Sequence, residues 1–215
     1  MSNFTYGNVI DFESKQLELK PRNITDESAI RLEMSRLAML DINALSGGST
    51  ENFENLANMR VNAFKEDFGN GVCTRIMVYN ASGSILTFQD STDSSGHWGN
   101  NTLPTEIQVG QWATALHEKS RGSATGSCGA VVFHIDMADE VFIISWDVPW
   151  SGDNHACCYT MLREKWNATS WDEAIKWAET EPRTGTDVCG PFTVDYSITN
   201  DSSPILRVVI RRHEG

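Results

Sequence analysis

The sequence predicts one mainly β domain, an antiparallel β-sandwich with flanking helices, and three observations support that prediction. After position 71, short runs of β-branched and aromatic residues alternate with turn residues, as they do in antiparallel sheets. Before that position, two stretches repeat apolar residues at helical spacing. The chain has 215 residues, 40% of them hydrophobic, with 7 Trp and 9 Phe, which is enough for one sizeable core.

We expect the chain to divide into three segments. They are an extended N-terminal arm over residues 1–22, a helical extension over 23–70 and the sandwich over 71–215. The arm alternates loosely between apolar and polar residues and ends at Pro21, which favours an extended strand over a helix.

Two amphipathic helices are predicted in the extension. Thr25 or Asp26 caps the first helix, which is expected to end at Gly47-Gly48. Its apolar positions are Ile30, Met34, Leu37, Leu40 and Ala44. The second helix is expected to begin after Thr50 and to end at the Gly-Asn-Gly break before position 72. Its apolar stripe, which should pack on the sheet, is Phe53, Ala57, Val61, Phe64 and Phe68.

Roughly nine strands are predicted after position 71. They span 72–79, 84–89, 105–109, 111–116, 128–134, 140–147, 156–163, 191–198 and 205–211. One helix is expected near residues 170–181, where Ser170 and Glu173 form a capping-box pattern. The stretch from Gln89 to Asn101 is predicted to be a long polar loop, because it holds Ser, Asp, Gly, His and Asn around a single Trp.

Charge and cysteine usage restrict the classes of partner and the compartment. The formal net charge of −12 opposes binding to nucleic acid or anionic lipid, since both carry the same sign. We find no signal-peptide pattern and no stretch near the ~18 apolar residues of a membrane span. The five cysteines are odd in number and are expected to be reduced. We therefore predict a cytoplasmic protein without a stable membrane span.

Motifs for catalysis or cofactor binding are lacking in the sequence. No Gly-x-Ser-x-Gly elbow places a nucleophile at a strained turn. The run from Gly122 to Gly126 lacks the Lys and the following helix of a phosphate loop. His155, Cys157 and Cys158 are of zinc-ligand type, but alternation along a strand places Cys158 on the opposite face. The prediction is therefore no catalytic residue, no metal and no cofactor.

Three segments carry a resemblance to a known family. They are EIQVGQWA at 106–113, RGSATGSCGAVV at 121–132 and ISWDVPW at 144–150. In order and spacing these segments resemble the core of the actinoporins. The closer resemblance is to the plant jasmonate-induced proteins, which have similar segments to VYNASG at 78–83 and GHWG at 96–99. The resemblance covers residues 71–181 and implies an actinoporin-like β-sandwich of the cytolysin and lectin type.

The resemblance implies either sphingomyelin-dependent pore formation or sugar binding, and the residues depart from the pore-forming pattern. The Ser of the segment that holds phosphocholine in actinoporins is Asp147 here, which would place a carboxylate beside a phosphate. Pro149 matches that segment, and Trp150 replaces an aromatic partner. The polar faces of the two predicted helices are acidic, whereas a basic face suits an anionic membrane surface.

We therefore predict a stress- or defence-associated, lectin-like binding protein that recognises a glycan, a lipid headgroup or a protein partner without turnover. The alternative is a membrane-active, pore-forming protein. Aromatic rings and a few polar groups should converge on a ligand site at one end of the sandwich. The residues of this predicted site are Trp98, Asp147, Pro149, Trp150, Asn154, His155 and Tyr159. For the aromatic residues among them, burial in the core is the competing interpretation.

Overall fold

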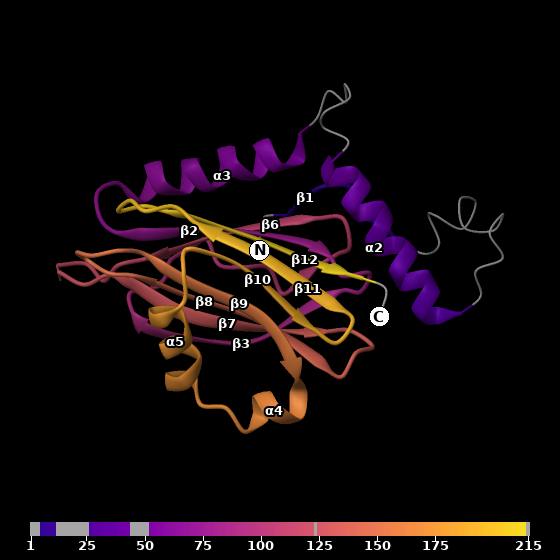
Figure 1. Cartoon of the computed structure of the whole chain (residues 1–215). Helices are drawn as coiled ribbons and strands as arrows, with labels where there is room; N and C mark the ends of the chain where they lie inside the picture. The colour runs from indigo at the N-terminus through magenta and orange to yellow at the C-terminus, as the bar shows by residue number, and fades with distance from the viewer. Residues whose placement is uncertain (1–4, 12–25, 44–51, 123, 214–215) are drawn as a thin grey trace.

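The computed structural model describes residues 5–11, 26–43, 52–122 and 124–213. Two β-sheets pack face to face, and helices cover the outer face of each (Figure 1). Helices α2 and α3 lie on the first sheet, and α4 and α5 lie on the second. The predicted β-sandwich with flanking helices is therefore confirmed.

The first sheet has the strand order β1-β6-β2-β12-β11-β10, and the short strand β4 pairs with β6. Its strands are β1 (Thr5–Tyr6), β2 (Cys73–Ala81), β4 (His97–Trp98), β6 (Trp112–Glu118), β10 (Thr184–Cys189), β11 (Phe192–Ile198) and β12 (Ile205–Arg212). Strand β12 runs parallel to β2, with Val208 opposite Val78. Every other strand pair within the described ranges is antiparallel.

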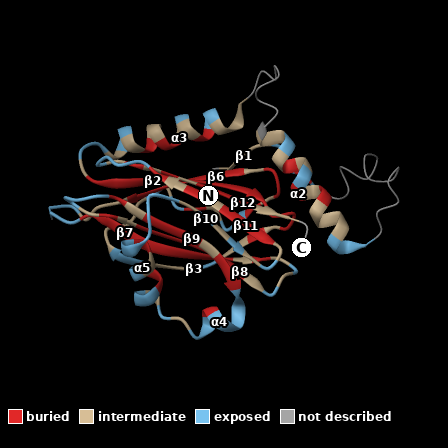
Figure 2. Cartoon of the chain, viewed as in Figure 1, coloured by how far each residue is buried: buried red, intermediate tan, exposed pale blue. Residues whose placement is uncertain are grey.

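The second sheet has the strand order β5-β3-β7-β8-β9. Its strands are β3 (Leu86–Ser95), β5 (Glu106–Ile107), β7 (Ser127–Ile135), β8 (Glu140–Val148) and β9 (His155–Leu162). The inward side chains of both sheets form one core, which includes Ile76, Phe133, Phe142 and Trp146 (Figure 2). All nine predicted strands are present, so runs of β-branched and aromatic residues between turn residues were sufficient to locate them.

Helices α2 (Glu27–Asn43) and α3 (Phe53–Phe68) cover the first sheet. Asp26 caps α2 as predicted, because its carboxylate accepts a 3.0 Å hydrogen bond from the Ala29 N–H. The prediction that Leu40 belongs to the apolar face of this helix is wrong, since its side chain is exposed. Ala38 is buried against the sheet instead. The Tyr79 hydroxyl donates to the Ala38 carbonyl oxygen at 2.8 Å and fixes α2 on the sheet.

Helix α3 packs through the predicted stripe, of which Ala57, Val61 and Phe64 are fully buried. It begins at the N-cap Asn52, whose side chain accepts from the Asn55 N–H, and it ends at Gly69. The predicted start at Thr50 and the predicted end of the preceding helix at Gly47-Gly48 lie outside the described residues.

Helices α4 (Arg163–Asn167) and α5 (Trp171–Thr180) cover the second sheet. The predicted cap of α5 is confirmed, since the Ser170 hydroxyl accepts a 3.2 Å hydrogen bond from the Glu173 N–H. Helix α4 was not predicted, because it is short and buries only Trp166. No helix in the described ranges is long and apolar enough to cross a bilayer.

The prediction of a polar loop from Gln89 to Asn101 is wrong. Strand β3 continues through Ser95 and pairs with β7, with register shifts at two points, and β4 follows directly. Beyond Thr87, strand β3 is the edge of its sheet, since β5 pairs only with Leu86 and Thr87. An edge strand has exposed positions that accept polar residues. The sequence of this strand therefore lacks the apolar alternation on which the strand prediction depended.

Candidate functional site

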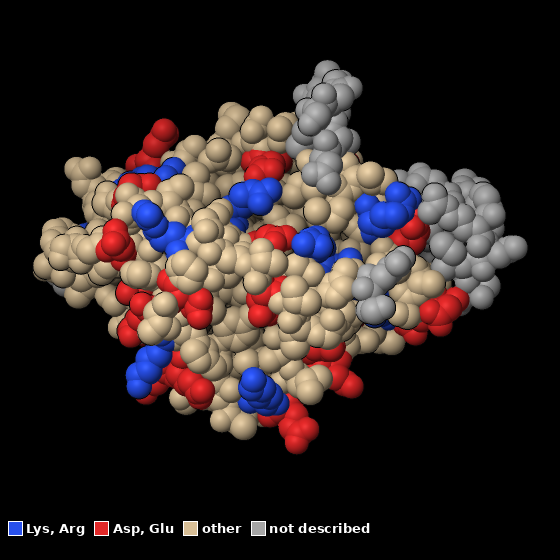
Figure 3. Space-filling model, in the orientation of Figure 1, with Lys and Arg blue, Asp and Glu red and all other residues tan. Residues whose placement is uncertain are grey.

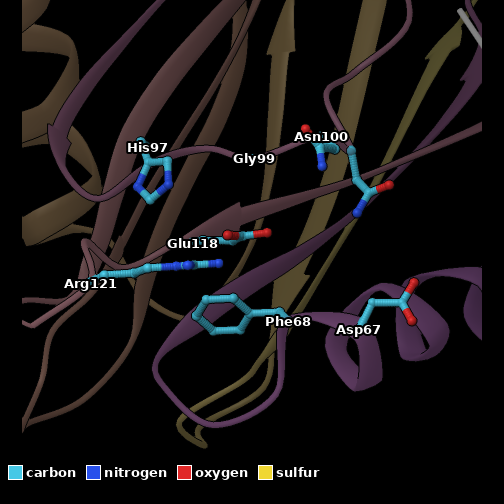
Figure 4. A pocket seen from close by; sticks show the side chains of 8 residues that line it. Asp67, Phe68, His97, Gly99, Asn100, Glu118 and Arg121 are labelled. Atoms are coloured by element: carbon cyan, nitrogen blue, oxygen red, sulfur yellow. The ribbon is translucent and has the colours of Figure 1, made fainter.

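A polar pocket opens at the end of the sandwich where β4, the end of β6 and the last turn of α3 meet (Figure 4). Its volume is about 300 Å³. The side chains and backbone that line it belong to Asp67, Phe68, His97, Gly99, Asn100, Asn101, Glu118 and Arg121. The pocket therefore combines residues from three separate parts of the chain.

The segment Gly96–Gly99, noted above for its resemblance to jasmonate-induced proteins, forms one wall of this pocket. Gly96 has a φ of 96°, and a Cβ at this position would lie 2.4 Å from the Glu118 carbonyl oxygen. Only glycine allows so close an approach in this backbone region. Strand β4 can therefore pair with β6, which places His97 opposite Glu118 at the pocket.

The lining side chains offer charges of both signs, amides and one aromatic ring. Figure 4 shows Arg121 and Glu118 extending close together, with the Phe68 ring beside them and Asp67 farther along α3. Asn100 projects from the loop that follows β4. A ligand in this pocket meets donors from guanidinium and amide groups and acceptors from carboxylates.

Trp150 is 54% exposed, and it contacts Lys119, the residue that follows Glu118 of the pocket lining. The Lys119 ammonium lies 5.5 Å from the centre of the Trp150 ring, which is cation–π distance. Lys119 also packs near the pocket, because a Cβ on Gly71 would lie 2.7 Å from its Cε atom and 3.2 Å from the Phe68 ring. Lys119 therefore lies between the Phe68 ring of the pocket and the exposed Trp150 ring.

A buried polar network lies behind β4 and joins the two sheets. His117 Nδ1 lies 2.8 Å from Ser127 Oγ, and His117 Nε2 lies 3.1 Å from Asp93 Oδ1. Thr74 Oγ1 lies 2.7 Å from the same Ser127 hydroxyl. The ring of Trp98 packs edge-on against His117 at a centroid distance of 5.1 Å.

This network contains a Ser, a His and an Asp in contact, which are the residue types of the catalytic triad in serine hydrolases. In those enzymes Nε2 faces the serine and Nδ1 faces the aspartate, whereas His117 has the two nitrogens reversed. Ser127 is completely buried, and the lining of the polar pocket does not include it. The arrangement fits a structural connection between the sheets better than an accessible nucleophile.

The structure separates the predicted site residues into groups. Trp98 is half-buried and packs against His117 and Trp146 at the edge of the core. Pro149 precedes Trp150 and lies against Gly126 of the β6–β7 connection. These residues lie at the end of the sandwich that carries the polar pocket.

Asn154 is buried and connects strands. Its side-chain amide donates to the carbonyl oxygens of Thr199 and Asp201 at 2.9 and 2.8 Å. Its backbone N–H donates to Asn200 Oδ1 at 3.0 Å. These contacts fasten the start of β9 to the β11–β12 turn, and they occupy the donors that would otherwise face a ligand.

Asp147, His155 and Tyr159 lie on the outer face of the second sheet, on the side that α5 covers. Burial, and then the nearby charge of Glu179, raise the pKa of Asp147. His155 Nδ1 lies 2.9 Å from the Glu181 carbonyl oxygen.

Tyr159 packs edge-on against Trp177 of α5, with ring centres 4.8 Å apart. Burial also raises the pKa of its hydroxyl. That hydroxyl is buried and has no hydrogen-bond partner in the part of the chain that the structure describes. The binding role of Asp147, His155 and Tyr159 stays a prediction, at a place apart from the pocket.

Sequence reasoning missed most of the pocket lining. Asp67, Glu118 and Arg121 lie in segments without a recognisable motif, and only folding brings them together. The segment around His97 was the one local signal. Across the described ranges, no group of three His, Cys, Asp or Glu residues could hold a metal ion.

The fold is a β-sandwich of two sheets flanked by helices, and comparison with known proteins identifies its family. The chain belongs to the Nakanori-like family, whose model, described as Nakanori-like protein, matches residues 6–213. A 23 kDa jasmonate-induced protein from Hordeum vulgare is 35% identical over 153 residues, which are 68% of this chain and 69% of that protein. The resemblance to jasmonate-induced proteins is therefore confirmed.

The solved structure of a relative shows the same fold. The crystal structure of the lipid binding protein Nakanori has a TM-score of 0.84 and 24% sequence identity, and the match covers 97% of this chain and 100% of that chain. The Xerocomus chrysenteron lectin XCL has a TM-score of 0.43 and 15% identity, and the match covers 66% of this chain and 99% of that chain. The second likeness is too remote to support a functional argument.

Proposed function

We propose that this protein is a non-enzymatic, cytoplasmic binding protein that acts in stress or defence and holds a lipid headgroup or a sugar in its polar pocket. The observation that carries the proposal is the combination of Arg121, Glu118, amide groups and the Phe68 ring in one cavity beside the exposed Trp150. Two relatives agree with it: Nakanori is a lipid binding protein, and the barley relative is jasmonate-induced.

The lining chemistry suits both kinds of ligand. The guanidinium of Arg121 and the amide of Asn100 can donate to phosphate or hydroxyl oxygens. The carboxylates of Asp67 and Glu118 can accept hydrogen bonds from sugar hydroxyls or attract the cationic group of a lipid headgroup. The Trp150 ring can stack on a sugar face or cover a quaternary ammonium. A lipid headgroup and a glycan therefore use the same set of side chains.

The charge distribution favours a neutral or zwitterionic ligand over a polyanion. The net charge is −12, and acidic and basic side chains are interspersed over the face shown in Figure 3. A highly anionic surface would be repelled over most of the molecule. We therefore expect zwitterionic headgroups or neutral sugars to bind in preference to anionic lipids.

The experiment is a glycan array run in parallel with flotation of vesicles made of phosphatidylcholine, sphingomyelin or phosphatidylserine. Saturable binding is expected in one of these arms, and Arg121→Gln should weaken it by removing the positive charge and the guanidinium donors from the pocket. Arg163→Gln is the matched control, because Arg163 lies in α4 and is exposed. Equal weakening by both substitutions, or strongest binding to phosphatidylserine, would contradict the proposal.

The alternatives predict other results in the same experiment. A pore-forming protein would release a trapped dye from the vesicles. Such activity requires a helix to leave the sheet, which for α3 means exposing Phe64 and separating Arg207 from Glu54. Binding without leakage supports the proposal, and leakage supports the membrane-active alternative. No binding to either lipids or glycans would favour a protein partner.

A further inference from the structure

A second, apolar groove lies at the end of the sandwich opposite the polar pocket. It opens between α2, the segment after β1, and the turns that follow β2 and β7. Its volume is about 420 Å³. The apolar side chains that line it are Ile10, Ile30, Met34, Ile85, Val109 and Met137.

The walls of this apolar groove are held in place by short contacts. Gly83 in the β2–β3 turn has a φ of 78°, and a Cβ there would lie 2.1 Å from the Arg31 carbonyl oxygen of α2. The Arg31 guanidinium donates to Ser84 Oγ at 2.7 Å and to the Asp136 carbonyl oxygen at 3.1 Å. The groove is therefore largely formed before a ligand arrives, which reduces the entropy lost on binding.

The rim of the groove is acidic. Among the residues that the structure describes, Asp11, Glu27 and Asp136 line it together with one cation, Arg31. Glu27 pairs with Arg31, and the carboxylate of Asp136 accepts from the Thr87 hydroxyl and lies 3.4 Å from His134 Nδ1. Arg31 is held at one side of the groove, and within its described lining the carboxylates outnumber the cations by three to one.

Met137 is the most unusual residue of the groove. It is 75% exposed, and its φ of 61° places a bulky side chain in the left-handed region that such residues rarely occupy. A glycine or asparagine would be easier to accommodate at this turn. An exposed, flexible and polarisable side chain held at the edge of an apolar groove suits contact with an apolar ligand.

We propose that this groove binds a small amphipathic cation, with its apolar part on the floor and its positive group at the acidic rim. The volume and lining suit a single aliphatic chain or a compact apolar body. The excess of carboxylates selects a positive over a negative head. This site is separate from the polar pocket, and the proposal does not depend on what that pocket binds.

The experiment follows the methionine methyl signals of the full chain by NMR during titration with decyltrimethylammonium below its micelle concentration. The expected result is a saturable shift of Met34 and Met137. Met59 is the internal control, because it lies on α3 and is 66% exposed. Decanesulfonate has the same chain with the opposite charge and should bind about fivefold more weakly.

Two variants separate the apolar and the charged contributions. Met137→Gly removes a lining side chain and relieves its backbone conformation, so affinity should fall about tenfold without loss of folding stability. Glu27→Gln combined with Asp136→Asn should abolish the preference for the cation. No saturable shift of Met34 and Met137, an equal shift of Met59, or equal affinity for the sulfonate would overturn the proposal. Binding of a basic amphipathic peptide but not of decyltrimethylammonium would also overturn it.

Discussion

Trp150→Ala tests directly whether the exposed tryptophan beside the polar pocket serves binding or packing. Trp150 is 54% exposed and touches Lys119, whereas Trp146, four positions earlier on β8, is 0% exposed and lies in the core. The same substitution at the two positions therefore removes the same atoms from two different environments. Trp146→Ala serves as the matched control for a purely structural role.

The exposed fractions give the expected magnitudes. Truncating a fully buried tryptophan costs about 3–5 kcal/mol of folding free energy, which we expect for Trp146→Ala. Trp150 has less than half of its surface buried, in a loop that can relax, so Trp150→Ala should cost about 1–2 kcal/mol. In a chain of this length these values correspond to a lowering of the melting temperature by about 2–4 °C per kcal/mol. Loss of an aromatic contact at a binding hot spot costs about 1–3 kcal/mol of binding free energy.

The assays are urea unfolding and binding to whichever vesicle or glycan the wild-type protein recognises. The expected pattern for Trp150→Ala is a small loss of stability with a loss of affinity of about 5- to 150-fold. A loss of stability as large as that of Trp146→Ala would show that Trp150 is a packing residue. Unchanged affinity would remove Trp150 from the binding site.

Three further predictions concern the buried polar groups. Tyr159→Phe should raise the free energy of unfolding by about 1–3 kcal/mol in urea titrations, because it removes a buried hydroxyl without a described partner; a loss of stability would contradict this. Burial and the charge of Glu179 raise the pKa of Asp147 in the folded state. Between the unfolded-state pKa of about 3.9 and this raised pKa, the folded state keeps a proton that the unfolded state has lost, so the free energy of unfolding falls as the pH rises through that range. Asp147→Asn should therefore stabilise the protein above that range and not below it; a gain that is the same at every pH would contradict this. Ser127→Ala should cost about 1–3 kcal/mol of folding free energy, because His117 Nδ1 and the Thr74 hydroxyl both lose the buried Ser127 hydroxyl as a partner. A serine-directed fluorophosphonate should not label the wild type, and labelling at Ser127 would indicate an enzyme.

The strands could be predicted from the sequence wherever apolar residues alternate or run continuously. Strands β7 and β8 are examples, since almost all their residues are buried. The second half of β3 and all of β10 were missed, because these edge strands carry Ser, Thr, Asp and Gly. Their pairing depends on the backbone of the neighbouring strand, to which side-chain polarity gives no guide.

The candidate site was harder to predict than the fold. The resemblance drew attention to Trp98, Pro149 and Trp150, and all three lie at the end that carries the polar pocket. Asn154 was grouped with them because it is near in sequence, but its amide faces the β11–β12 turn. Closeness in sequence places side chains on alternate faces of a strand and on both sides of a turn, so it does not place them in one site.

The most direct test of the proposed function is to locate the ligand on the protein. Once the screen has identified a headgroup or sugar, its soluble form can be titrated while the amide and indole N–H signals are followed by NMR. The proposal predicts saturable shifts of the Asn100 and Asn101 side-chain amides and of the Trp150 indole, which all lie in or beside the pocket. Shifts confined to other surfaces, with these three signals unmoved, would contradict it.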